Sequence, residues 1–172
     1  SFVLAAIIFF WGCGSSARLS MDAIRHAVYD MPKVGRITFE KGDYDREADS
    51  SRGQTSIHIG PVDLFAFGDL NGDGREDAVT FLSSSFGGPE IFLSLEVFIN
   101  DDGSPSHVGS YLIGDRVAID SVKIEGQMIN LYVITQGPDD AVCCPTLHVQ
   151  RDLELQNGRL VEMGGRGKPQ PR

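Results

Sequence analysis

The stretch that decides the fold reads Val62-Asp63-Leu64-Phe65-Ala66-Phe67-Gly68-Asp69-Leu70-Asn71-Gly72-Asp73-Gly74-Arg75-Glu76-Asp77-Ala78-Val79-Thr80-Phe81-Leu82. Its two ends, residues 62–67 and 78–82, are rich in residues that favour β-strands, and neither shows a helical period. Between them, residues 68–77 consist mostly of Gly, Asp and Asn, which dominate turns. The stretch therefore predicts two strands joined by a loop.

Oxygen-bearing residues recur in this loop at the spacing of calcium ligands. With Asp69 as position 1, positions 3, 5 and 9 carry Asn71, Asp73 and Asp77, and the Arg75 carbonyl falls at position 7. Gly74 stands at position 6, where a calcium loop must turn sharply. An EF-hand is excluded for two reasons. Position 12 of an EF-hand loop is Glu, whereas it is Thr80 here, and an EF-hand loop is flanked by helices, whereas these flanks favour strands. The sequence predicts a Ca²⁺ site here, with a metal-free turn as the alternative.

The loop in its setting, Phe-Gly-Asp-Leu-Asn-Gly-Asp-Gly-Arg-Glu-Asp-Ala-Val, resembles the calcium loops of FG-GAP and VCBS-type repeats, related to the dockerin type. The resemblance implies a loop in a β-hairpin, with Asp69, Asn71, Asp73 and Asp77 as side-chain ligands. Propeller members of that family carry several such loops, whereas this chain has one. A propeller is not expected, since one blade cannot bury its faces alone.

Short strand-like segments with turn signals between them fill most of the remaining chain. They cover residues 55–59, 91–100, 107–113, 116–124, 128–135, 147–155 and 159–163, with a further hairpin over 36–44 and a flexible loop over 83–89. Ahead of them, apolar residues from Leu19 to Val28 recur at helical spacing, with Ser20 as cap and Met31-Pro32 as stop. We expect a mainly β fold, either an antiparallel β-sandwich or an open barrel or meander, with one short N-terminal helix packed on the sheet.

The N-terminus has the features of an export signal. Residues 2–11 form an uncharged apolar run, too short to span a bilayer but typical of a signal-peptide core. Gly12-Cys13 follows at once and resembles a bacterial lipobox, which implies acylation of Cys13 and a membrane anchor. Ordinary signal-peptidase cleavage near residues 15–17 and an uncleaved anchor remain alternatives. The predicted organisation is a signal segment at 1–12, the lipobox cysteine and linker at 13–18, one β-rich domain at 19–163 and a disordered basic tail at 164–172.

Cys143 and Cys144 are adjacent and precede Pro145. Neighbouring Cα atoms lie about 3.8 Å apart, below the usual disulfide span of about 4.4–6.8 Å. We expect a strained vicinal disulfide, because an exported protein meets an oxidising compartment. Free thiols are one alternative, and a redox or soft-metal site that includes His148 is another.

The net charge and the sequence motifs limit the classes of function that fit this chain. The chain of 172 residues has a net charge of −9, which argues against a nucleic-acid partner. No HExxH, GxSxG or phosphate-binding glycine motif occurs, and we assign no catalytic residue. The Asp pairs at 101–102 and 139–140 lie in turn sequences, and Arg116 is expected to pair with a nearby carboxylate or to bind an anion.

A second resemblance concerns the order of motifs along the chain. The lipobox-like Cys, the calcium-type loop, the Gly114-Asp115-Arg116 step and the Gly-Pro-Asp-Asp-x-x-Cys-Cys-Pro-Thr loop are similar to a group of bacterial exported lipoproteins of unassigned activity. We expect a calcium-stabilised, non-catalytic domain on the periplasmic or extracellular face of the cell envelope, lipid-anchored or secreted, with a protein or small-molecule partner. The alternative is an envelope enzyme or redox protein that uses the Cys143–Cys144 loop.

Overall fold

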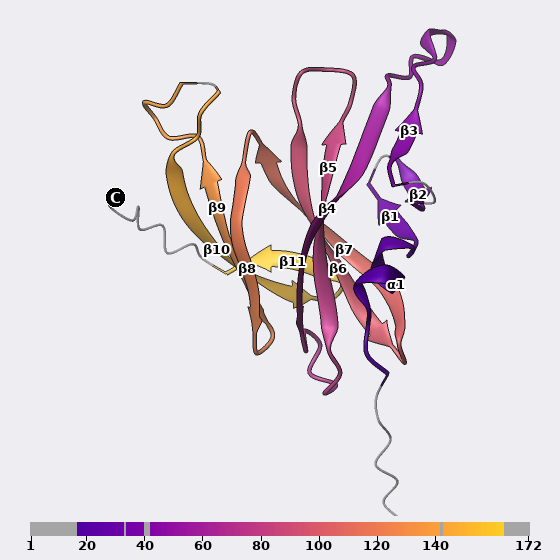
Figure 1. Cartoon of the computed structure of the whole chain (residues 1–172), viewed down its shortest axis with the longest axis vertical. Helices are drawn as coiled ribbons and strands as arrows, with labels where there is room; N and C mark the ends of the chain where they lie inside the picture. The colour runs from indigo at the N-terminus through magenta and orange to yellow at the C-terminus, as the bar shows by residue number, and fades with distance from the viewer. Residues whose placement is uncertain (1–16, 33, 40–41, 142, 164–172) are drawn as a thin grey trace, which may run out of the picture.

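The computed structural model describes residues 17–163 except 33, 40–41 and 142. The elements in chain order are α1 (Met21–Arg25), β1 (Tyr29–Met31), β2 (Gly35–Ile37), β3 (Tyr44–Arg46), the 3-10 helix η1 (Ser50–Arg52), β4 (Ile57–Gly68), β5 (Asp77–Ser85), β6 (Phe92–Asp101), β7 (Ser104–Asp115), β8 (Ala118–Glu125), β9 (Met128–Thr135), β10 (Leu147–Gln156) and β11 (Arg159–Glu162). The expected mainly β fold with one short helix is confirmed (Figure 1).

Each of the two larger sheets is a meander of antiparallel strands. The first has the order β3-β4-β5-β6-β7, and the second has the order β11-β10-β9-β8. Short turns such as Asn157-Gly158, both with positive φ, join neighbouring strands. The antiparallel sheets are curled, in agreement with the expected sandwich or open barrel (Figure 1).

The central strands of the five-stranded sheet are buried on both faces. Along β5, Val79 and Phe81 enter the core between the two sheets, together with Leu95, Val97, Ile113, Ile129, Leu131, Val133, Leu153 and Leu70. The alternate residues Ala78 and Leu82 enter a second core, shared with Phe98, Ile57, Ile59 and the N-terminal segment. Side chains of a strand alternate between faces, so the near-continuous apolar run of β5 reflects two covered faces. We call these the inter-sheet core and the N-terminal core.

The short N-terminal helix is present but ends earlier than the helical spacing from Leu19 to Val28 predicts. Ser20 caps α1 as expected, because its hydroxyl accepts the Ala23 N–H at 3.0 Å, and Ile24 packs in the N-terminal core. The helix ends at Arg25, however, and Tyr29–Met31 forms β1. Ala27, Tyr29 and Met31 are buried while their neighbours are exposed, so the period of two prevails there over the helical spacing.

The expected hairpin over 36–44 is wrong in its pairing. Strand β2 pairs with β1, and β3 pairs with β4. Two other expectations also need correction. Residues 55–59 and 62–67 were expected as two strands, but β4 continues through Gly60-Pro61, with a register shift between Val62 and Ala66. The serines at 83–85 belong to β5 instead of a flexible loop.

Several expectations fall on residues that the structure does not describe. The signal segment, Cys13 and the basic tail lie outside the described residues. Within the described part of the chain, no helix has the length and apolar content needed to cross a bilayer.

Candidate functional site

The calcium-type loop forms the connection between β4 and β5, as its flanks predict. Gly72 and Gly74 take φ values of 80° and 81°, the left-handed region that glycine enters without strain. The expected sharp turn at Gly74 is therefore present. Leu70 is only 2% exposed and lies in the inter-sheet core, so the loop is fixed to the body of the domain near its start.

Asp69 holds the loop closed around its own carboxylate. Its Oδ1 accepts the N–H groups of Gly72 at 2.7 Å and Asp73 at 3.2 Å, and its Oδ2 accepts the Gly74 N–H at 2.8 Å. Three consecutive backbone donors thus point at one carboxylate. This arrangement places the Asp69 carboxylate on the inner side of the turn.

Asn71 and Asp73 continue this pattern. Asn71 Oδ1 accepts the Asp73 N–H at 2.9 Å, and Asp73 Oδ1 accepts the Arg75 N–H at 2.8 Å. The bond from Arg75 and a further bond from the Asn71 amide lower the pKa of Asp73 below its usual range. Asp73 therefore carries a full negative charge at neutral pH.

Asp77 occupies a different environment from the other candidate ligands. It is 0% exposed, and its two oxygens accept the N–H groups of Leu70 at 2.8 Å and Asn100 at 2.9 Å. Burial raises the pKa of Asp77 despite these bonds. Asp77 ties the loop to its own start and to the end of β6, so it has a structural role that needs no metal.

The donor chemistry of the loop suits a hard cation, but the side chains are not gathered around one point. Asp and Asn oxygens and a backbone carbonyl are the ligands that Ca²⁺ prefers. Among the residues that the structure describes, however, no three His, Cys, Asp or Glu side chains form a group that could hold a metal ion. Binding Ca²⁺ through Asp69, Asp73 and Asp77 would require these carboxylates to converge further.

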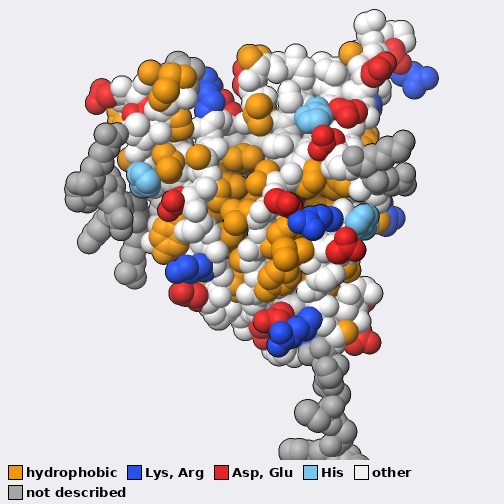
Figure 2. Space-filling model, in the orientation of Figure 1, with side chains coloured by type: hydrophobic (Ala, Val, Ile, Leu, Met, Phe, Trp, Pro, Cys, Tyr) orange, Lys and Arg blue, Asp and Glu red, His pale blue; other side chains and the backbone are white. Residues whose placement is uncertain are grey.

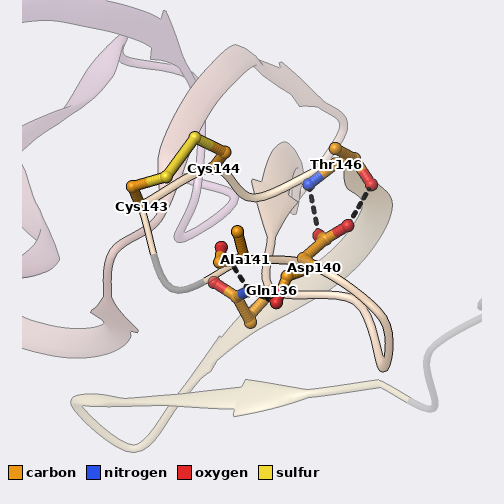
Figure 3. The surroundings of a disulfide bond; sticks show 6 residues. All are labelled: Gln136, Asp140, Ala141, Cys143, Cys144 and Thr146. Atoms are coloured by element: carbon orange, nitrogen blue, oxygen red, sulfur yellow. Dashed lines mark hydrogen bonds between the residues drawn. A yellow bond between two sulfur atoms is a disulfide. The ribbon is translucent and has the colours of Figure 1, made fainter.

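The adjacent cysteines lie in the connection between β9 and β10 (Figure 3). Their sulfur atoms are at disulfide distance and their Cα atoms are 3.8 Å apart, so the expected vicinal pairing is present. Both residues are exposed. The described residues include no soft-metal cluster of these cysteines with His148.

Asp140 organises this cysteine loop. Its carboxylate accepts the backbone N–H at 2.6 Å and the hydroxyl at 2.6 Å of Thr146 (Figure 3). It also accepts the backbone N–H of Gly137 at 2.8 Å. Gln136 adds bonds to the carbonyls of Asp140 and Ala141. The acidic side chain therefore closes the loop, and these bonds account for its presence without catalysis.

A buried polar network that the sequence did not single out links β6 and β7. Glu96 is 0% exposed and accepts hydrogen bonds from the hydroxyls of Ser94 and Ser110 and from His107 Nε2. His107 Nδ1 lies 3.1 Å from the backbone nitrogen of Asp30. A backbone N–H can only donate, so Nδ1 is the acceptor of this bond and Nε2 is the ring nitrogen that faces the Glu96 carboxylate.

The network does not have the arrangement of a nucleophile and its base. Ser110 and His107 both donate to Glu96, so the hydroxyl of Ser110 is not bonded to the imidazole. The one signal in the sequence was Glu96 between the apolar residues Leu95 and Val97, and the register of β6 with β7 places it opposite Ser110. That register depends on a bulge between Val97 and Phe98, which the sequence does not reveal.

Arg116 adopts the simpler of the two expected roles. It forms an ion pair with the neighbouring Asp115 at 2.5 Å and has a left-handed φ of 50° in the turn after β7. Arg116 therefore pairs with a nearby carboxylate in a turn, which was one of its two expected roles.

Comparisons with protein-family models, with curated proteins and with solved structures found no match to this chain.

Proposed function

We propose that this protein is a calcium-stabilised, non-catalytic β domain that acts as a structural or interaction module at the bacterial cell envelope. The observation that carries the proposal is the Asp69–Asp77 loop, where successive oxygen side chains sit on a connection anchored at both ends. Leu70 fixes its start in the inter-sheet core, and Asp77 fixes its end to Asn100. A cation would neutralise three carboxylates crowded into nine residues.

Calcium is expected to raise the melting temperature of the wild-type protein by roughly 5–10 °C over the value in EDTA. A ligand that binds only the native state adds about 2.7 kcal/mol to the free energy of unfolding at a hundredfold excess over its dissociation constant. Each kcal/mol raises the melting temperature of a domain of this size by about 2–4 °C. Magnesium should give a smaller rise, because it requires near-octahedral geometry and sheds water reluctantly. Thermal melts in EDTA, calcium and magnesium measure the effect.

Two variants serve as a matched pair for this test. Asp73→Ala removes an exposed carboxylate whose bonds stay within the loop, and it should abolish the calcium effect. Asp101→Ala removes an exposed acid at the end of β6 and should keep the effect. Equal wild-type melting temperatures in EDTA and calcium would leave the loop as an ordinary turn.

The envelope part of the proposal depends on Cys13. In a full-length protein with its signal start, Cys13→Ser is expected to move the domain from the membrane to the soluble exported fraction. Fractionation with intact-mass measurement checks this, since an acylated mature chain carries the mass of its lipid. Unchanged membrane association of the variant would contradict acylation at this residue.

A redox function is the second candidate, favoured by the exposed vicinal cysteine pair. The pair is expected to be oxidised in the exported protein, so thiol labelling of denatured, unreduced mature chains should find almost no reactive sulfur. Stoichiometric labelling of both cysteines would contradict a closed disulfide. Replacing both by serine separates the two functions: the module should lose only stability, whereas a redox protein should lose activity and keep its fold.

A further inference from the structure

Strand β1 is held on the five-stranded sheet by apolar packing and by a hydrogen bond to one histidine. Tyr29 and Met31 are buried in the N-terminal core, and β1 pairs with β2 in a separate two-stranded sheet. Among the described residues, the bond from the Asp30 N–H to His107 Nδ1, 3.1 Å long, is the single hydrogen bond between β1 and the five-stranded sheet. The polar part of this contact therefore depends on the state of one imidazole.

This hydrogen bond requires a lone pair on His107 Nδ1, because a backbone N–H can only donate. The other ring nitrogen, Nε2, lies 2.8 Å from Glu96 Oε2, where it donates its proton to the carboxylate. A second proton on the imidazole has only Nδ1 to bind, and there it meets the Asp30 N–H. Protonation of the ring therefore replaces an acceptor by a donor, and two facing donors form no hydrogen bond.

Two acidic side chains lie near the ring and favour its charged form. Glu96 on β6 is 0% exposed and lies on the Nε2 side, where it also accepts from Ser94 and Ser110. The Asp30 carboxylate is exposed and borders the same cleft as His107. An opposite charge nearby offsets the free-energy cost of charging a buried group. Glu96 also keeps the Nε2 side of a protonated ring bonded to the sheet.

The other titratable and charged groups around His107 act more weakly on it. Burial and the charge of Glu96 raise the pKa of Tyr29, so this phenol stays neutral in acid. Arg159 on β11 borders the same cleft and is exposed, as is Arg36, opposite Asp30 on β2, so water and salt screen both. Charged side chains on and just after α1, which contacts β7, have partners of their own: Arg25 with Asp63, and His26 with Asp22. Figure 2 shows acidic and basic side chains next to one another on the visible face, where their charges largely cancel.

A cleft brings solvent next to the ring. It has a volume of about 400 Å³, lies between β1, β7 and the β10–β11 turn, and is lined in part by Asp30, His107, Ser110, Gly158 and Arg159. The His107 side chain itself is only 3% exposed, so a proton reaches it when its surroundings open locally. Such an opening at the cleft wall leaves the pairing of β6 with β7 intact.

We propose that His107 is a pH-sensitive switch, in which protonation of its imidazole releases the Asp30 N–H and loosens β1 on β7. The proton comes from solvent and binds Nδ1, and the only covalent bond that forms is this N–H bond. The contact is present while the ring is neutral and is lost as the pH falls. The change is local, because Glu96 still holds the ring on the sheet. The proposal is independent of calcium binding and of acylation at Cys13.

The test is NMR spectroscopy of the ¹⁵N-labelled protein between about pH 7.5 and about pH 5, the range in which histidine ordinarily titrates. The two ring nitrogen signals of His107 report its protonation. Amide hydrogen exchange, corrected for the intrinsic effect of pH, reports the hydrogen bond of Asp30. As Nδ1 takes up its proton, protection at Asp30 should fall about tenfold with the same midpoint, while the amides of β5 and β6 keep their protection.

Two variants separate this histidine from the others. His107→Gln offers a side-chain oxygen to the Asp30 N–H but cannot titrate, so its Asp30 protection should not depend on pH. His58→Gln removes an exposed histidine bonded to Asp45 and should keep the wild-type pH dependence.

Three outcomes would overturn the proposal. One is a wild-type His107 that stays unprotonated over the whole range, and another is protonation of its Nδ1 with unchanged protection at Asp30. The third is a His107→Gln protein in which Asp30 still loses protection in acid. The first two readings are made on the wild type, so they decide the proposal even if His107→Gln fails to fold.

Discussion

Asp77→Ala is expected to lower the free energy of unfolding by about 2–5 kcal/mol even in calcium-free buffer. The substitution leaves the N–H groups of Leu70 and Asn100 without their acceptor in a buried environment. Each unsatisfied buried donor costs about 1–3 kcal/mol of stability. At about 2–4 °C per kcal/mol, the melting temperature should fall by roughly 5–15 °C. Thermal and urea melts in EDTA measure both quantities.

Asp73→Ala is the matched control for this prediction. Asp73 belongs to the same loop, but its oxygens accept only from Asn71 and Arg75, so its loss in EDTA should cost about 1 kcal/mol or less. Both variants should fail to respond to calcium if the loop binds it. An Asp77→Ala protein as stable as the wild type in EDTA would show that the carboxylate has no structural role.

This pair of residues shows what spacing reveals and what it hides. The sequence places Asp69, Asp73 and Asp77 in one series of ligands, and the structure places Asp69 and Asp73 on the predicted β4–β5 connection and Asp77 at the start of β5. Spacing along a loop contains no information about burial, however. The hydrogen bond from the Asn100 N–H, at the end of β6, to Asp77 depends on the pairing of β5 with β6. That pairing is a property of the whole sheet.

The same distinction explains which elements were predicted well. Residues 128–135 form β9 with the expected bounds, because the turn before it and the polar loop after it mark both ends. The prediction for the segment after α1 was wrong because Ala27 fits both a helical series and an alternating one. Packing of Tyr29 against Phe39 and Phe98, with ring centroids 5.0 and 4.9 Å away, favours the strand and cannot be inferred from local pattern.

The buried polar network was missed for a related reason. Its members come from two strands and from the segment before them, and only the register of β6 with β7 brings Glu96 opposite Ser110. A single acidic residue in an apolar strand is a recognisable signal. Its partners become identifiable only when the strand order and the bulge next to Phe98 are known.

Glu96→Ala is expected to lower the free energy of unfolding by about 3–5 kcal/mol, because each buried donor left without its acceptor costs about 1–3 kcal/mol. Three donors, the hydroxyls of Ser94 and Ser110 and the His107 Nε2–H, lose their common acceptor. The His107 side chain is only 3% exposed, so water cannot readily replace the carboxylate.

The consequences of Glu96→Ala should extend to the N-terminal segment. His107 accepts the Asp30 N–H and its ring lies 5.7 Å from that of Tyr29, so loss of its orientation loosens β1 on the sheet. Hydrogen exchange should therefore become faster at Asp30 as well as on β6 and β7, while the melting temperature falls by roughly 6–20 °C. Glu125→Ala, at the exposed end of β8, is the control and should change stability by no more than about 0.5 kcal/mol. Wild-type protection at Asp30 in a destabilised Glu96→Ala protein would contradict the coupling, because it would mean that His107 keeps its place without the carboxylate.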